Sequence, residues 1–261
     1  MKYGFIGCGN MGGAIAKALA KATTDFAITD RSGKAIGLAA EIPCGYLPAV
    51  EIAENCDRIF LAVKPHMMKD VLAPLQPILA EKKPLLITMA AGLTTDQIAE
   101  FAGCQIPVIR IMPNTPVSIG KGVIQYCCND LVDGEVLADF LRDMRFSGIL
   151  DALEERLIDA GSAISGSGPA YGYLFIEALA DGAVACGIPR AKALEYAAAT
   201  VIGAGELVLA TGQHPGALKD AVCSPGGSTI AGIRELENHG FRAAAMDCVI
   251  ATYRRNQELG K

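Results

Sequence analysis

A glycine-rich turn near the start of the chain has the spacing that a bound pyrophosphate requires. Residues 7–12 read Gly-Cys-Gly-Asn-Met-Gly, after a short apolar run and before an alanine-rich segment. In a strand-turn-helix unit the first glycine permits a tight turn, the second lets a pyrophosphate approach the backbone, and the third lets helix and strand pack closely. The helix N-terminus adds free N–H groups and a positive dipole end. We therefore predict dinucleotide binding, rather than an ordinary glycine turn, at Ile6, Gly7, Gly9, Asn10, Met11 and Gly12.

The residues about 20 positions further on are expected to face the adenosine ribose of such a ligand. Asp30 could accept a hydrogen bond from a ribose 2′-hydroxyl, which favours NAD. Arg31 and Ser32 could instead hold a 2′-phosphate, which favours NADP. Ser32 is equally well placed to cap the next helix. The sequence leaves these alternatives open.

Three further segments lie where strands are expected to end. In a parallel sheet, ligands bind beyond the carboxyl ends of the strands, so these segments should line the cofactor's ribose and nicotinamide. Asn114, between two prolines, could orient the nicotinamide amide, or it could form an Asx turn that serves only the backbone. The predicted cofactor-binding residues of this group are Ala62, Val63, Lys64, Pro65, Ala90, Ala91, Gly92 and Asn114.

A second glycine turn lies in the last third of the chain. Residues 223–232 read Cys-Ser-Pro-Gly-Gly-Ser-Thr-Ile-Ala-Gly. Consecutive N–H groups and hydroxyls at the start of a helix suit a carboxylate. The alternative is structural: Ser228 or Thr229 would cap the helix, and the two glycines would permit its sharp start.

The elements that must position these turns follow from periodicity. Short apolar runs alternate with alanine-rich helical runs up to about residue 151, which predicts an α/β, doubly wound, largely parallel Rossmann-type sheet. Strands are expected at 3–6, 26–29, 58–63, 85–89, 108–111, 123–126 and 146–150, and helices at 11–21, 32–40, 67–80, 95–101 and 134–144. Beyond residue 151 only helices are expected, at 154–159, 169–186, 190–209, 215–222, 228–237 and 240–258. We predict a dinucleotide-binding domain at 1–151 and an all-helical domain at 152–261.

Composition excludes several functional classes. The chain has 261 residues, 51% hydrophobic and 20% charged, which indicates a globular protein. A net charge of −5 argues against nucleic acid as a partner. No signal peptide and no membrane span are expected, and an odd number of cysteines, nine, favours free thiols in the cytoplasm. The three histidines lack the spacing of a metal pair or of a Ser/His/Asp triad, so we expect no metal.

Together these motifs resemble the pyrroline-5-carboxylate reductase family over essentially the whole chain. The glycine turn at 7–12 and the segment 62–65 also occur in related dehydrogenases. Two stretches are more specific: Ser-Gly-Ser-Gly-Pro-Ala-Tyr at 165–171 and Asp-Ala-Val-Cys-Ser-Pro-Gly-Gly-Ser-Thr-Ile-Ala-Gly at 220–232, the latter preceded by His-Pro-Gly at 214–216.

The resemblance implies reduction of the C=N bond of 1-pyrroline-5-carboxylate to L-proline, the last step of proline biosynthesis, by NADPH or alternatively NADH. It also implies a C-terminal helical domain that forms a homodimer, in many members assembled further into a decamer, a pentamer of dimers. By motif position, Ser224, Gly227, Ser228 and Thr229 would bind the substrate, with Thr229 as the catalytic residue nearest the imine nitrogen. Asp30 and Ala49 depart from the family pattern, since many members carry a cofactor-contacting asparagine about where Ala49 stands, and both leave the cofactor preference open.

Two other readings remain. The β-hydroxyacid dehydrogenases share the glycine turn and a helical domain, but they carry a lysine a few residues after a Gly-Ser-Gly segment. Residues 169–173 here are Pro, Ala, Tyr, Gly and Tyr, without a lysine. A non-catalytic nucleotide sensor would need the first glycine turn but has no use for the second.

Overall fold

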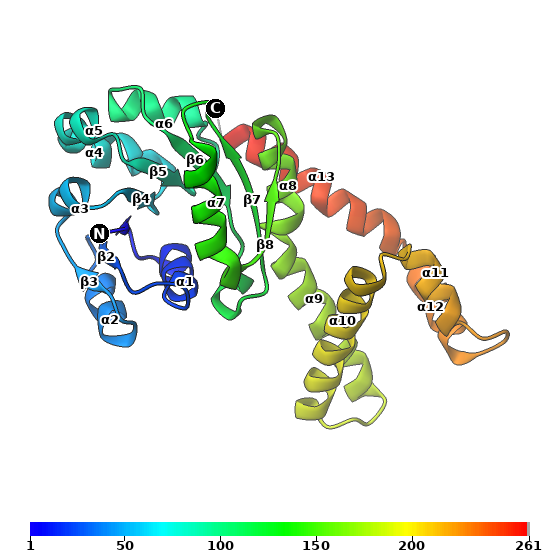
Figure 1. Cartoon of the computed structure of the whole chain (residues 1–261). Coiled ribbons are helices and arrows are strands. Elements are labelled where there is room, and N and C mark those ends of the chain that lie inside the picture. Colours follow the sequence, from blue (N-terminus) through cyan, green and yellow to red (C-terminus); the bar gives the residue numbers. More distant parts are fainter. Residues whose placement is uncertain (260–261) are drawn as a thin grey trace. The chain divides into compact units, whose positions relative to one another are not determined.

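The computed structural model describes residues 1–259, which form two compact units (Figure 1). The first unit contains Met1–Ser167 and the chain from Thr252 onward, and the second contains Gly168–Ala251. The domain boundary between residues 151 and 152 stays a prediction.

The first unit is built on one eight-stranded sheet of order β3-β2-β1-β4-β5-β6-β7-β8. Every neighbouring pair is parallel except β6 and β7, so the expected doubly wound, largely parallel sheet is confirmed. The sequence missed only β3, whose two residues are too few to show a pattern. The strands are β1 (Tyr3–Ile6), β2 (Phe26–Thr29), β3 (Gly45–Tyr46), β4 (Arg58–Leu61), β5 (Leu85–Thr88), β6 (Val108–Met112), β7 (Gly122–Cys128) and β8 (Gly148–Ala152).

Helices cover both faces of this sheet (Figure 1). The single helix expected at 67–80 is wrong: a 3-10 turn at Ala73–Leu75, containing Pro74, separates two short helices, because proline has no N–H to continue the α-helical ladder. The helix at Ala49–Asn55 was not expected, and the one expected at 154–159 begins at Ile158 after a 3-10 turn. The helices are α1 (Asn10–Leu19), α2 (Lys34–Glu41), α3 (Ala49–Asn55), α4 (Met68–Leu72), α5 (Gln76–Lys82), α6 (Thr95–Ala102), α7 (Gly134–Asp143) and α8 (Ile158–Ser165).

Two apolar clusters, one on each face, bury the central strands. Alternate side chains of a strand point to opposite faces, so Phe5 and Phe60 lie in one cluster while Ile6 and Ile59 lie in the other. The rings of Phe5 and Phe60 stack with their centroids 4.3 Å apart. Burial on both faces fixes β1 and β4 side by side, which places the turns that follow them at the same edge of the sheet.

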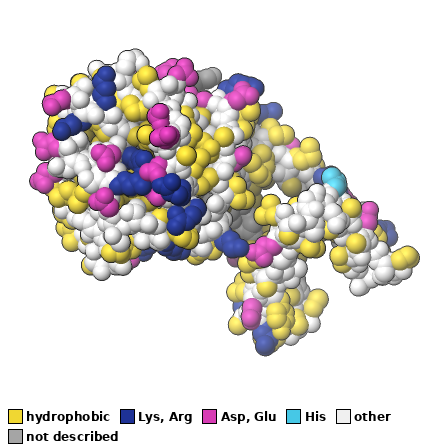
Figure 2. Space-filling view, in the orientation of Figure 1, with side chains coloured by type: hydrophobic (Ala, Val, Ile, Leu, Met, Phe, Trp, Pro, Cys, Tyr) yellow, Lys and Arg dark blue, Asp and Glu magenta, His cyan; other side chains and the backbone are white. Residues whose placement is uncertain are grey.

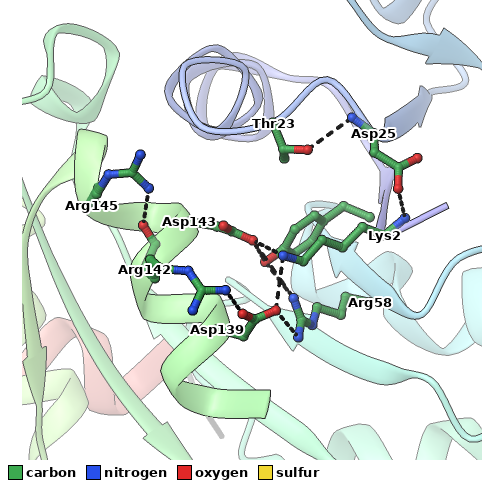
Figure 3. Close-up of polar contacts among 9 residues, drawn as sticks. Lys2, Thr23, Asp25, Arg58, Asp139, Arg142, Asp143 and Arg145 are labelled. Carbon is green, nitrogen blue, oxygen red and sulfur yellow. Dashed lines mark hydrogen bonds and ion pairs between the residues drawn. The ribbon is translucent and has the colours of Figure 1, made fainter. Parts of the chain in front are cut away.

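A cluster of charges ties α7 to the opposite, amino-terminal ends of β1 and β4 (Figure 3). The Tyr3 hydroxyl donates to Asp143 Oδ2 at 2.8 Å, and Lys2 Nζ lies 2.7 Å from the same oxygen. Arg58 Nη2 donates to Asp139 Oδ2 at 3.0 Å. Burial alone would raise the pKa of Asp143, but the bonds from Lys2 and Tyr3 outweigh it and hold that pKa below its ordinary value.

Replacing Asp143 should therefore destabilise the first unit. Asp143→Asn replaces a carboxylate that is 7% exposed with a neutral amide. The Lys2 ammonium group and the Tyr3 hydroxyl then lose their charged acceptor, at a cost of about 3 kcal/mol in stability. Because the folded pKa is lowered, the stabilisation is complete above the unfolded value of about 3.9 and is lost as the pH falls below it. Thermal unfolding should show the full difference from wild type at pH 7 and a shrinking one below about pH 4.

Arg142→Ala is the matched control. The Arg142 side chain also pairs with Asp139 but is 63% exposed, so its loss should cost less than about 1 kcal/mol. Equal losses of stability in the two variants would contradict a larger stabilising role for the buried Asp143 carboxylate.

The second unit is entirely helical in its described residues. It comprises α9 (Gly168–Ala185), α10 (Arg190–Thr211), α11 (Pro215–Val222), α12 (Ser228–Asn238) and the first part of α13 (Phe241–Leu259). Small side chains at Ala180, Ala193 and Ala197 pack α9 against α10. The expected helices are confirmed to within a few residues at each end.

Many apolar side chains of this unit point away from its core, and Figure 2 shows hydrophobic surface over α9 and α10. Leu174, Ile202, Leu209 and Met246 are each more than half exposed. By length and composition α10 could also cross a membrane, although a single helix of this kind is weak evidence for a span. Contiguous exposed apolar surface more often marks a protein interface.

Candidate functional site

A pocket of about 840 Å³ opens in the first unit, lined by the turns that follow β1, β2, β4 and β5. These turns meet because parallel strands end at the same edge of the sheet. Of the predicted cofactor-binding residues, it is lined by Ile6, Gly7, Gly9, Asn10, Met11, Gly12, Asp30, Arg31, Ser32, Ala62, Val63, Lys64, Pro65, Ala90 and Ala91. Gly92 and Asn114 are not among its lining residues.

The three glycines of the first turn have different geometric roles. Gly7 has a φ of +106°, and a Cβ there would lie 2.5 Å from the Ala62 carbonyl oxygen. A Cβ on Gly12 would lie 2.4 Å from the Gly7 carbonyl oxygen. A Cβ on Gly9 would meet nothing within 4 Å. The first and third glycines therefore close the turn, while the second keeps the pocket open at the N-terminus of α1, where a pyrophosphate fits.

Asp30 directly follows β2, and its carboxylate accepts hydrogen bonds from residues a few positions further along the chain. Its Oδ2 accepts from the Ser32 hydroxyl at 2.5 Å, and its Oδ1 accepts from the Ala35 N–H at 3.1 Å. The alternative in which Ser32 caps α2 is wrong, because the N-cap is Gly33 and the Ser32 hydroxyl is directed to Asp30. Burial would raise the pKa of Asp30, but the bonds from Ser32 and from backbone N–H groups hold it below its ordinary value.

The Asn114 side chain bonds backbone groups of two other segments, and its expected role at the nicotinamide stays a prediction. Its Nδ2 donates to the Ser165 carbonyl oxygen at 2.9 Å, and its Oδ1 accepts from the Val123 N–H at 2.9 Å. It makes no side-chain cap at the 3-10 turn that follows it, Thr115–Ile119, so the Asx-turn alternative is not realised. At 6% exposure, this amide joins β6, β7 and the end of α8.

Asn114→Ala should therefore reduce stability rather than cofactor affinity. The substitution leaves the Val123 N–H and the Ser165 carbonyl without their partner, which costs about 2–3 kcal/mol. Urea unfolding would measure this loss, and NADPH titration of the folded variant should give an unchanged Kd. A variant of unchanged stability that binds NADPH more weakly would instead indicate that Asn114 contacts the nicotinamide.

The second glycine turn is a distinct feature of the second unit. The Gly227 N–H donates to the Ser224 carbonyl at 3.0 Å, and Gly226 has a φ of +67°, as in a type II turn with Pro225 at its second position. Gly227 is the N-cap of α12, and no side chain caps the helix, so neither Ser228 nor Thr229 has the predicted capping role. The first N–H groups of a helix have no intrahelical acceptors. The exposed hydroxyls of Ser224, Ser228 and Thr229 have no hydrogen-bond partner within the described part of the chain.

Two of the three histidines, His214 and His239, have structural contacts. His214 is the N-cap of α11 and accepts from the Gly216 N–H through Nδ1 at 3.1 Å. His239 Nδ1 lies 2.9 Å from the Glu235 carbonyl oxygen. Residues 1–259 contain no group of three or more His, Cys, Asp or Glu side chains that could hold a metal ion.

Several lining residues were not predicted. Lys34 belongs to the same turn as Arg31, and its proximity in sequence could have revealed it. Val50 of α3 and Asp70 of α4 line the pocket from helices whose distance along the chain gave no local signal. Ala49 of α3 also lines the pocket, at the position where the family resemblance indicated a cofactor contact. Only the packing of these helices on the sheet brings them to the pocket.

Comparison with protein families gives two matches. Residues 155–259 match the family model described as pyrroline-5-carboxylate reductase dimerisation, and residues 2–92 match NADP oxidoreductase coenzyme F420-dependent. The chain is 42% identical over 266 aligned positions to the pyrroline-5-carboxylate reductase of Escherichia coli K12, covering 100% of this chain and 98% of that protein. It is 40% identical to the enzyme of the same name from Glycine max, covering 98% and 95%.

Solved structures agree with these matches. The Plasmodium falciparum pyrroline carboxylate reductase, crystallised with NADP bound, is similar with a TM-score of 0.89 at 33% identity, covering 100% of this chain and 98% of that one. The Coxiella burnetii pyrroline-5-carboxylate reductase gives a TM-score of 0.91 at 34% identity, with the same coverage. An imine reductase from Myxococcus stipitatus, at 18% identity and a TM-score of 0.54, shares the fold alone.

Proposed function

The chain belongs to the pyrroline-5-carboxylate reductase family, and we propose that it reduces 1-pyrroline-5-carboxylate to L-proline, the last step of proline biosynthesis, with NADPH as the hydride donor. The observation that carries this proposal is that both predicted turns have groups suited to their ligands. The first leaves space for a pyrophosphate beside Gly9, and the second presents uncapped N–H groups and hydroxyls without partners in the described chain.

The pocket residues suit a dinucleotide from end to end. N–H groups at the start of α1 bind the pyrophosphate, and the turn after β2 faces the adenosine ribose. Ala62–Pro65 and Ala90–Ala91 lie further along the same edge of the sheet, where the nicotinamide end is accommodated. When bound, the cofactor supplies a hydride from its nicotinamide ring.

The turn at residues 224–229 suits a small carboxylic acid. The N–H groups at the start of α12 bind the substrate carboxylate together with the Ser224 and Ser228 hydroxyls, so no arginine is needed. A Cβ on Gly227 would lie 2.4 Å from the Ser224 Oγ, so glycine at this position lets the Ser224 hydroxyl lie close to the start of α12. The hydroxyl of Thr229, in the first turn of α12, hydrogen-bonds the ring nitrogen.

A C=N carbon accepts hydride best when its nitrogen is protonated, so the protein has to orient the imine and supply or stabilise one proton. A neutral hydroxyl that hydrogen-bonds the nitrogen is sufficient for this. No histidine or metal ion is required for the step as we propose it.

A spectrophotometric assay at 340 nm tests the function. We expect NADPH oxidation that depends on 1-pyrroline-5-carboxylate, with L-proline as the product. With β-hydroxyacids and NADP⁺ we expect no reduction of NADP⁺ to NADPH. Oxidation of hydroxyacids would indicate a β-hydroxyacid dehydrogenase. Cofactor binding without turnover of the imine would indicate a nucleotide sensor.

We also propose that the chain forms a homodimer through its second unit, further assembled as a pentamer of dimers, in the cytoplasm. The match of residues 155–259 to a dimerisation family and the exposed apolar side chains of α9, α10 and α13 support the dimer. The nine free cysteines suit a reducing compartment.

The mass in solution tests this assembly. Light scattering on the full chain should give ten times, or at least twice, the monomer mass of 27.2 kDa. A monomer at micromolar concentration would contradict an apolar subunit interface.

A further inference from the structure

The turn between β5 and α6 forms one wall of the pocket. Met89, Ala90 and Ala91 line the pocket here. An alanine side chain has no rotamers with which to adjust to a ligand. The position of this wall therefore depends on the course of the backbone, which has to be fixed at the two ends of the turn.

Thr88, the last residue of β5, holds the first end of the turn. Its Oγ1 accepts a hydrogen bond from the Ala90 N–H at 3.2 Å, a bond that threonine makes to the backbone two residues further on. Thr88 is 0% exposed, and its strand is paired on both sides, with Leu61 of β4 and Arg110 of β6 as the register partners of Thr88. The hydroxyl therefore ties Ala90 to an interior strand of the sheet.

Glu155 holds the other end of the turn. Its Oε1 accepts from the Thr95 N–H at 2.8 Å, and its Oε2 accepts from the Thr95 hydroxyl at 3.1 Å. Thr95 is the first residue of α6, where the helix dipole favours a carboxylate. Glu155 Oε1 also lies 3.6 Å from Nη1 of the buried Arg110. Since Arg110 is also the register partner of Thr88, both ends of the turn are anchored at the same residue of β6.

We propose that Thr88 is a positioning residue for the reduction of the imine. With Glu155 holding the far end of the turn, the Thr88 hydroxyl fixes Ala90 and Ala91 as the wall against which the nicotinamide ring lies. Hydride transfer requires reacting atoms about 3–3.5 Å apart, and a displacement of about 1 Å costs about 100-fold in rate. The proposal rests on the proposed function, in which the nicotinamide end of the cofactor lies beside this turn.

Two substitutions separate the hydroxyl from the rest of the side chain. Thr88→Val leaves the buried Ala90 N–H without its acceptor, whereas Thr88→Ser retains the hydroxyl. In single-turnover experiments with saturating NADPH and 1-pyrroline-5-carboxylate, we expect Thr88→Val to oxidise the cofactor about tenfold more slowly, with a Kd for NADPH within about twofold of wild type. Thr88→Ser should stay within about threefold of the wild-type rate.

Ser147→Ala is the matched control for loss of a buried hydroxyl. Ser147 is 0% exposed, its hydroxyl donates to the Met144 carbonyl oxygen, and it is not among the residues that line the pocket. This variant should unfold at a lower temperature and keep the wild-type single-turnover rate. A wild-type rate in Thr88→Val, or equal losses in Thr88→Val and Thr88→Ser, would overturn the proposal.

Hydrogen exchange measures the turn without any turnover. In the wild type, NADPH should slow amide exchange in residues 89–92, and adenosine 2′,5′-bisphosphate, which lacks the nicotinamide, should not. In Thr88→Val the turn should exchange faster, and NADPH should no longer protect it. Equal protection by NADPH in wild type and Thr88→Val would contradict the proposal. Protection in a wild type that does not reduce the imine would refute the proposed function alone.

Glu155→Gln tests the other end of the turn and covers the case in which Thr88→Val folds poorly. The amide keeps one acceptor oxygen for the two Thr95 donors, so we expect a single-turnover rate about threefold lower and weaker protection by NADPH. Glu154→Gln is its control, because the Glu154 side chain is exposed and pairs with the exposed Arg156, and it should change neither quantity. Wild-type rates and protection in Glu155→Gln would overturn the assignment of both anchors.

Discussion

Gly9→Ala is expected to weaken NADPH binding roughly 100-fold while leaving the melting temperature of the protein unchanged. The added Cβ meets no protein atom within 4 Å, so it introduces no strain into the fold. It occupies the space that a pyrophosphate needs in order to reach the N–H groups at the start of α1. Loss of about two charge-assisted hydrogen bonds costs about 3 kcal/mol, which corresponds to the expected loss of affinity. Fluorescence titration with NADPH and differential scanning calorimetry measure the two quantities separately.

The neighbouring glycines provide matched variants. Gly12→Ala places a Cβ 2.4 Å from the Gly7 carbonyl oxygen and 2.8 Å from the Ala62 Cβ, so we expect a loss of about 3 kcal/mol in stability, or roughly 5–10 °C. Gly13→Ala, whose nearest contact would be an ordinary 3.6 Å, should affect neither property. An unaltered NADPH affinity in Gly9→Ala would place the pyrophosphate elsewhere and remove the basis of the proposed cofactor site.

Thr229→Ala is expected to lower kcat for imine reduction about 100-fold, with NADPH affinity unchanged. Proton transfer or hydrogen bonding to the reacting group by a positioned side chain contributes a factor of at least about 100. The Thr229 hydroxyl has no hydrogen-bond partner within the described residues and no capping role, so its removal should not disturb α12. Steady-state kinetics at saturating NADPH would measure the effect, and cofactor titration would confirm intact binding.

The conservative variants separate the role of the hydroxyl from that of the backbone. Thr229→Ser retains the hydroxyl and should keep kcat within about tenfold of wild type. Ser228→Ala should mainly raise KM for the substrate, because we assign Ser228 to the carboxylate and not to the imine nitrogen. If Thr229→Ala turned over at the wild-type rate, Thr229 would have no part in the reaction, although the reaction itself would stand.

The sheet of the first unit could be predicted largely because its strands are buried on both faces, so apolar runs mark them. The two short helices on either side of Pro74 could not be predicted separately, because the apolar periodicity of residues 67–80 continues through the 3-10 turn that separates them. Ser32 and Asn114 show a second limit. Each is a residue type with several possible hydrogen-bond partners, and in each the partner in the folded chain differs from the nearest candidate in sequence.

By itself, the sequence determined the alternation of strand and helix, the glycine turn after β1 and the helical second half, because these depend on periodicity and on residues a few positions apart. The family followed from motifs that are likewise local. Only the tertiary structure decided which backbone groups Asn114 bonds and that Asp70 lines the pocket. Hydrogen-bond partners and pocket walls depend on how distant segments pack, and a carboxylate or amide accepts whichever donor the fold brings within about 3 Å.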